Sequence, residues 1–134
     1  GAAYLVGLGG SFAARDGLLG LNPSDFTCSA APALGETWST QVATTPSLGA
    51  STIRTFVALG AGGPTPGATV FGHELLILPP FLIVEGFGAH DLQVPPESAL
   101  FGVRHSWQGG RLERGAGGAL FIVLTNALDV VYGL

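Results

Sequence analysis

Two apolar segments in the second half of the chain constrain its fold more than any other feature. Residues 94–109 open with Pro95-Pro96, and apolar and polar residues alternate from residue 100 to residue 108. Residues 120–133 are almost continuously apolar. A proline pair makes a rigid turn, and alternation with a period of two indicates a strand. The sequence therefore predicts two strands packed side by side, around which the rest of the chain is organised.

The remainder of the chain consists of short β-branched or aromatic runs between glycines and prolines. There are 22 Gly and 9 Pro in 134 residues, and no segment keeps a helical apolar period over three turns. This pattern is typical of a sandwich or barrel of antiparallel strands. It predicts an all-β fold, an antiparallel β-sandwich of Ig-like or jelly-roll-like type. Strands are expected at residues 2–8, 25–30, 37–45, 52–59, 74–78, 81–86, 100–108, 119–124 and 127–132, and connections at 60–67, 89–93 and 109–118, with 11–21 mixed.

The charge content is low for a chain of this length, which is that of a single domain. Only 10% of residues are charged, against a typical share of about 25%. The apolar runs at 75–84 and 119–124 are too short or are broken by prolines, whereas a membrane span needs about 20 residues. The five cations are scattered arginines, so no nucleic-acid footprint is present. We therefore expect this chain to belong to an assembly that covers much of its surface.

The chain contains no methionine, even at its first position, and begins Gly-Ala-Ala. This predicts a chain cut from a precursor, most simply by removal of a signal peptide, and hence a secreted, extracellular protein. The single cysteine, Cys28, rules out an internal disulfide and is expected to be a small buried hydrophobic residue.

The residue types that carry chemistry form no recognisable catalytic pattern. The spacings of His73, His90 and His105, 17 and 15 residues, match no zinc motif. There is no Gly-x-Ser-x-Gly motif, and Ser106 beside His105 has the wrong geometry for a nucleophile and its base. We therefore expect no enzyme activity, no catalytic residue, no cofactor and no metal ligand.

Two weaker alternatives stay open at this point. Loop carboxylates could bind calcium, and aromatic side chains could stack on sugars, although a role in the core is expected for the aromatics. The candidate calcium ligands are Asp91, Glu97 and Asp129, and the aromatic residues are Tyr4, Trp38, Trp107 and Tyr132.

A set of short motifs is shared with a known type of module. The motifs are Asn22-Pro23, Pro32-Ala33-Leu34-Gly35, Gly72-His73-Glu74-Leu75-Leu76-Ile77, Val94-Pro95, Leu100-x-Gly102, Gln108-Gly109 and the closing run from Leu124 to Gly133. In these, residues 21–134 resemble a functionally uncharacterised Gly/Pro-rich β module of secreted bacterial proteins. The resemblance implies export and a β-sandwich, and it supplies no activity. The chain departs from the pattern in having no second cysteine to pair with Cys28.

The resemblance leaves residues 1–20 as an N-terminal extension outside the domain at 21–134. This extension carries an apolar strand on a glycine-rich tether, with Tyr4, Leu5, Val6 and Leu8 as the candidate interface residues. The strand could fold onto its own sheet as an edge strand. Alternatively, it could pair with the sheet of a neighbouring subunit, a head-to-tail contact that generates rings or filaments.

The function expected from these features is structural. The chain would be a subunit of an extracellular bacterial filament, pilus-like, or of a surface assembly, and would polymerise with itself by donating its N-terminal strand. The alternatives are a secreted module that binds a carbohydrate or a cell surface, and a viral capsid or decoration protein.

Overall fold

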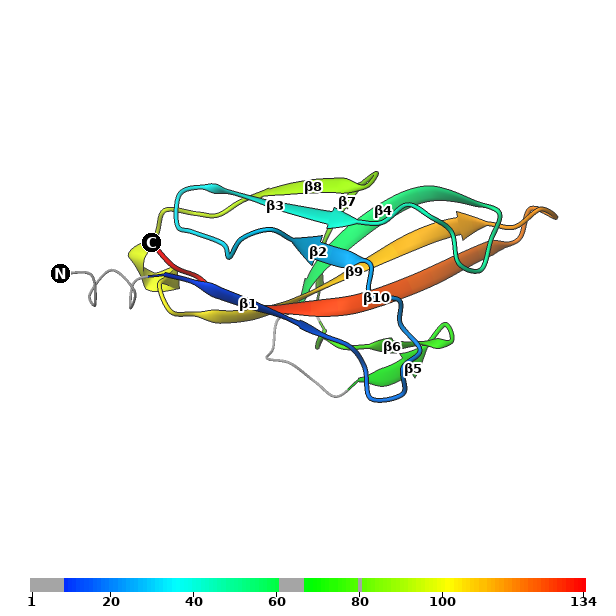
Figure 1. Cartoon of the computed structure of the whole chain (residues 1–134), viewed down its shortest axis with the longest axis horizontal. Coiled ribbons are helices and arrows are strands. Elements are labelled where there is room, and N and C mark those ends of the chain that lie inside the picture. Colours follow the sequence, from blue (N-terminus) through cyan, green and yellow to red (C-terminus); the bar gives the residue numbers. More distant parts are fainter. Residues whose placement is uncertain (1–8, 61–66, 80) are drawn as a thin grey trace.

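The computed structural model describes residues 9–60, 67–79 and 81–134 and shows an all-β protein with antiparallel sheets (Figure 1). The prediction of this fold class is confirmed. One turn of 3-10 helix, η1 (Ser98–Leu100), follows the double proline. The strands are β1 (Ser11–Arg15), β2 (Phe26–Cys28), β3 (Thr37–Val42), β4 (Ser51–Gly60), β5 (Ala68–Val70), β6 (His73–Leu75), β7 (Phe81–Gly86), β8 (Ala89–Gln93), β9 (Arg104–Arg114) and β10 (Leu120–Val131).

The strands form two larger sheets and one hairpin. The five-stranded sheet has the order β1-β10-β9-β4-β7, and the three-stranded sheet has the order β2-β3-β8. These sheets face each other, and the β5–β6 hairpin lies on the opposite side of the five-stranded sheet (Figure 1). The two longest strands, β9 and β10, are neighbours in the larger sheet, with Trp107 opposite Leu128. The two segments predicted to organise the chain therefore do lie side by side.

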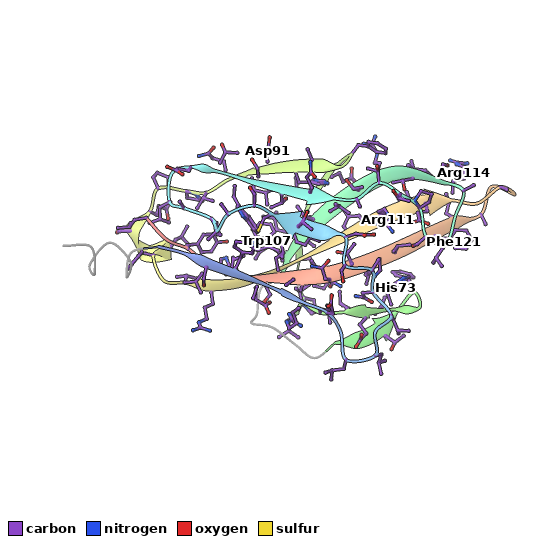
Figure 2. The ribbon with its side chains drawn as sticks, in the orientation of Figure 1. His73, Asp91, Trp107, Arg111, Arg114 and Phe121 are labelled. Carbon is purple, nitrogen blue, oxygen red and sulfur yellow. The ribbon has the colours of Figure 1, made fainter. Side chains whose placement is uncertain are left out.

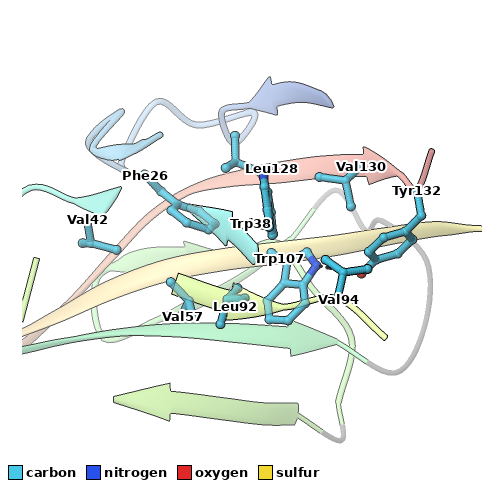
Figure 3. Close-up of a cluster of buried hydrophobic side chains, with 10 residues drawn as sticks. All are labelled: Phe26, Trp38, Val42, Val57, Leu92, Val94, Trp107, Leu128, Val130 and Tyr132. Atoms are coloured by element: carbon cyan, nitrogen blue, oxygen red, sulfur yellow. Dashed lines mark hydrogen bonds between the residues drawn. The ribbon is translucent and has the colours of Figure 1, made fainter. Parts of the chain in front are cut away.

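The core fills the space between the two larger sheets (Figure 3). Every second residue of β3 is buried, which confirms the predicted alternation of Trp38, Thr40 and Val42. Trp38 meets Trp107 of β9 edge to face, with ring centroids 5.8 Å apart, an arrangement worth about 1 kcal/mol beyond its burial. The cluster comprises Phe26, Trp38, Val42, Val57, Leu92, Val94, Trp107, Leu128, Val130 and Tyr132.

Two predicted connections are strands, and those predictions are wrong. Residues 89–93 form β8, which pairs with β3 and buries His90 and Leu92. Its outward residues are polar or small, so the alternation lacks the apolar content that marks a strand in sequence. Residues 109–114, predicted as part of a loop, continue β9. Gly110 lacks a side chain because the ring of Phe56 packs against its backbone, so this glycine serves close packing rather than a turn.

The last two predicted strands are one strand, β10, interrupted by a bulge. Its pairing with β9 shifts between Leu124 and Ala127, so Thr125 and Asn126 stand opposite a single residue, Gly109. The amide of Asn126 turns toward β2, where it accepts from the Phe26 N–H and donates to the Phe26 carbonyl, both at 2.9 Å. The bulge thus joins the two sheets.

The predicted strand at residues 2–8 lies outside the described residues. Directly after it, Ser11–Arg15 pairs with β10 and forms one edge of the five-stranded sheet. Gly10 packs against the backbone of Val131 and Gly133, so the start of β1 and the C-terminus lie at the same end of the molecule (Figure 1). Within the described part of the chain, no helix is long and apolar enough to cross a membrane.

Candidate functional site: an apolar sheet edge and its groove

The four predicted interface residues, Tyr4, Leu5, Val6 and Leu8, lie outside the described residues. The structure does describe the strand that follows them and the surfaces on which an added strand could pair. The five-stranded sheet has two edges, β1 and β7, and these edges differ in how they are held and what they expose.

The β1 edge is held mainly through its backbone. Its first four residues are exposed, although they pair in continuous register with β10. Arg15 is the half-buried exception: its guanidinium donates to Asp129 at 2.7 Å and to the Leu76 carbonyl at 2.8 Å. Because little side-chain area is buried, β1 is joined to the sheet by main-chain hydrogen bonds and this terminal ion pair.

The β7 edge is exposed, regular and apolar. Among the described strands β7 pairs only with β4, and the six-residue register contains no bulge. Exposed fractions are 60% for Leu82, 54% for Ile83 and 37% for Phe81, and the only charged residue in the strand is Glu85. Soluble proteins usually protect sheet edges with charges, prolines or bulges, so an edge of this kind is a template for pairing with another strand.

An apolar groove runs beside this edge on the side away from the three-stranded sheet. It has a volume of about 240 Å³. We call it the outer groove; its main walls are Phe56, Phe71, Leu75, Phe81, Ile83 and Ile122. Gln108 is the one polar side chain in its lining, and the Gln108 amide is already bonded to the Leu76 N–H and the Glu74 carbonyl, both at 2.9 Å. The groove therefore favours apolar groups.

A strained turn stands at the rim of the outer groove. Phe71 and Gly72 form the two-residue loop between the paired residues Val70 and His73, and both have positive φ, 53° and 77°. Such turns favour Asn-Gly, because a bulky side chain at positive φ is strained. Phe71 is nevertheless 65% exposed. A strained backbone that holds an exposed aromatic is a feature that functional sites often contain.

The β5–β6 hairpin is fixed to the sheet by two buried amides. Asn22 and Gln108 each donate to the carbonyls of Glu74 and Thr125, at distances between 2.8 and 2.9 Å. Asn22 also accepts from the Glu74 N–H at 2.7 Å. These bonds make one wall of the outer groove rigid relative to the sheet.

A charged cluster lies between the two larger sheets, toward the end that carries the β9–β10 turn (Figure 2). Arg111 is fully buried and donates to Glu113 at 2.9 Å, to Asp25 at 2.5 Å and to the Ala43 carbonyl at 3.0 Å. The carboxylate of Glu113 also accepts the backbone N–H groups of residues 47, 48 and 49. The cluster joins the residue before β2 and the segment after β3 to β9.

The environment of Glu113 stabilises its charged form. Burial alone raises the pKa of this carboxyl, but hydrogen bonds from the Gly49 N–H, from Arg111 and from the Leu48 and Ser47 N–H groups lower it, leaving a pKa of about 2. Glu113 accepts several hydrogen bonds because the loop at residues 47–49 wraps around its carboxylate. These hydrogen bonds hold that loop in place.

The three histidines lie in separate places. His90 contacts Thr55 Oγ1 at 2.7 Å, His105 contacts the Tyr132 hydroxyl at 2.8 Å and His73 contacts the Phe71 carbonyl at 3.2 Å. Burial lowers the pKa of both His90 and His105, and for His90 the charge of Asp91 opposes the effect. Over the ranges that the structure describes, no group of three His, Cys, Asp or Glu side chains is placed to hold a metal ion.

Several of the other residues considered from sequence are engaged in the fold. Ser106 donates to Asp129 at 2.8 Å on the outer side of β9, whereas its neighbour His105 faces the core side toward Tyr132. Trp38, Trp107 and Tyr132 are buried in the core and are closed to a sugar. Cys28 is half-buried against that core.

The sequence predicts the strand at residues 81–86 but does not mark its edge as a site. The available signal was the run of four apolar residues, 81–84, with no charge and no alternation. The sequence does not predict the Arg111 cluster either, because its members Asp25 and Arg111 are 86 residues apart. The motifs behind the resemblance, Gln108-Gly109 and residues 124–133, form the bulge and its amide contacts.

Comparisons with family models, curated proteins and solved structures found no match to this chain.

Proposed function

We propose that this chain is a structural subunit of an extracellular bacterial filament, pilus-like, or of a surface assembly. In this proposal residues 2–8 leave their own subunit and pair as a strand with the sheet of the next one. The contact is head-to-tail, so repetition extends a polymer.

The observation that carries the proposal is the position of β1. This strand follows the apolar segment after only two glycines, and it lies at the edge of the sheet with four of its five side chains exposed. β1 therefore begins at a sheet edge, and sheet edges are where strand addition takes place. Gly10, just before β1, packs against the backbones of Val131 and Gly133.

The surface of the subunit supports an assembly as well. Leu82, Ile83 and Phe71 are each more than half exposed, while only 10% of the residues of the chain are charged. Covering apolar surface is worth about 25 cal/mol per Å². Small domains that stay monomeric usually have more surface charge and fewer exposed apolar groups.

The same proposal includes the type of fold. The core between the five-stranded and three-stranded sheets supports a β-sandwich of Ig-like or jelly-roll-like type, with residues 21–134 as the domain and residues 1–20 as its extension. β1 belongs to this extension in sequence and to the larger sheet in its pairing.

Deletion of residues 1–10 tests the function. The truncated chain should be folded, soluble and monomeric by light scattering, whereas the full chain should form filaments or oligomers visible by negative-stain microscopy. A matched pair separates apolar anchoring from mere length: Tyr4→Ser with Val6→Ser should abolish assembly, and Ala2→Ser with Ala3→Ser should leave it intact. Filaments that persist after the deletion would falsify the proposal.

A further inference from the structure

We infer that the acceptor of the donated strand is the β7 edge of a second copy of this chain, and that the outer groove takes the strand's apolar side chains. This inference rests on the proposed function and assigns it a specific surface. It is carried by the geometry of β7, by the side-chain pattern of residues 2–8 and by the length of the link to β1.

The β7 edge offers what an added strand needs. Its six residues pair regularly with β4, so every second residue directs its backbone groups outward with no further strand beside it among those described. Main-chain hydrogen bonds to such an edge provide affinity, and pockets for alternate side chains provide specificity.

The two faces of β7 match the two faces of the donated segment. Phe81 and Ile83 line the outer groove, while Leu82 is exposed on the core side of the sheet, opposite Leu59 of β4. In residues 2–8, Tyr4, Val6 and Leu8 share one face and Leu5 lies on the other. The first set fits the groove, and Leu5 then covers Leu82.

Charge favours the same pairing. Residues 1–8 contain no charged side chain, and neither do residues 81–84. A strand with charged side chains would lose their hydration in the outer groove without gaining a partner. An uncharged apolar strand has no such cost.

The donated strand must come from another copy because the link to β1 is short. Three strands separate β1 from β7 in the sheet, so the two edges are about 19 Å apart at about 4.8 Å per strand. Gly9 and Gly10 alone connect Leu8 to Ser11, and three residue steps extend at most about 11 Å. A pairing over the whole segment, with Leu8 at the edge, therefore cannot be made to β7 of the same sheet, whereas the β7 edge of a neighbour can take it.

A charge placed on the β7 edge tests the acceptor. Ile83→Lys should raise the concentration needed for assembly by about tenfold or more, because the lysine replaces an apolar side chain at the contact. The matched control is Thr27→Lys, which adds the same charge at an exposed position on β2, an edge of the other sheet, and should leave assembly unchanged. Equal thermal unfolding of both variants shows that the fold is retained.

Cross-linking tests the contact directly in the full chain. In a Cys28→Ser background, Tyr4→Cys, Val6→Cys and Leu8→Cys are each combined with Ile83→Cys and treated with a mild thiol oxidant. At least one pair should give a ladder of disulfide-linked oligomers that collapses under reductant. The same three donors combined with Thr27→Cys should give none.

The outcomes separate this inference from the function on which it rests. If Ile83→Lys assembles like the unaltered chain, or the ladders form with Thr27→Cys, the acceptor is not β7, while strand donation stands as long as the deletion of residues 1–10 abolishes assembly. If that deletion leaves assembly intact, strand donation itself is wrong, and a contact through β7 would have to use another partner strand.

Discussion

The Arg111 cluster and the β7 edge reverse the usual distribution of charge and hydrophobicity. In the cluster, an arginine and a glutamate are completely buried and bonded to each other. At the edge, leucine and isoleucine side chains are more than half exposed. Every buried side-chain nitrogen and oxygen among the described residues has a hydrogen-bond partner. In these two regions, therefore, charge stabilises the interior of the chain, whereas apolar side chains lie at an exposed sheet edge.

Removing the buried cation should have the largest effect on stability. Arg111→Met leaves Glu113 buried without its charged partner and should lower the free energy of unfolding by about 3 to 5 kcal/mol. Arg114→Met, at an exposed position three residues further along β9, should change it by less than about 0.5 kcal/mol. Denaturant unfolding of the two variants measures the difference. Similar losses in both would show that the cluster is not the stabilising element of this end.

Acid should destabilise the end of the molecule that contains the Arg111 cluster. Because the folded pKa of Glu113 is about 2, below the ordinary value of 4.5, its contribution is fully present above pH 4.5 and is lost as the pH falls toward 2. The loss should amount to about 2 to 3 kcal/mol between these values. Thermal unfolding at a series of pH values measures it. In Glu113→Gln the slope over this range should be much smaller, and an unchanged slope would assign the titration to other carboxyls.

Strand β3 and residues 109–114 show how much of the fold the sequence predicts. The alternation of Trp38, Thr40 and Val42 predicted β3 correctly, because one of its faces lies on the core and the other in water. The sequence did not predict a strand at residues 109–114, because Gly109-Gly110 and three charged residues are typical of a loop. Their presence in a strand is explained by the packing of Phe56 against Gly110 and by the bonding of Arg111 to Asp25. Such long-range partners leave no trace in local periodicity.

Phe71, the exposed aromatic residue at the outer groove, should destabilise the β5–β6 hairpin because its φ is positive. Phe71→Asn replaces a strained residue with one that tolerates positive φ, so the turn becomes Asn-Gly and the free energy of unfolding should rise by about 1 kcal/mol. Calorimetry measures the gain. Gly72→Ala, which places a side chain at the other positive φ, is the opposing control and should destabilise. If Phe71→Asn is destabilising instead, Phe71 packs usefully within its own subunit and is not a residue held for an external contact.

The smallest effect on the isolated subunit is expected at the β7 edge, and its smallness is informative. Ile83→Thr keeps the β-branched shape and removes apolar surface that is already 54% exposed, so the unfolding free energy should change by no more than about 0.5 kcal/mol. Val57→Thr, at a fully buried position on the neighbouring strand β4, should cost several times as much, because it places a hydroxyl in the core. Unfolding measured at a concentration too low for assembly gives both values. A loss at Ile83 as large as that at Val57 would mean that this edge already stabilises its own subunit, and the contrast between a charged interior and an apolar edge kept for a neighbour would no longer hold.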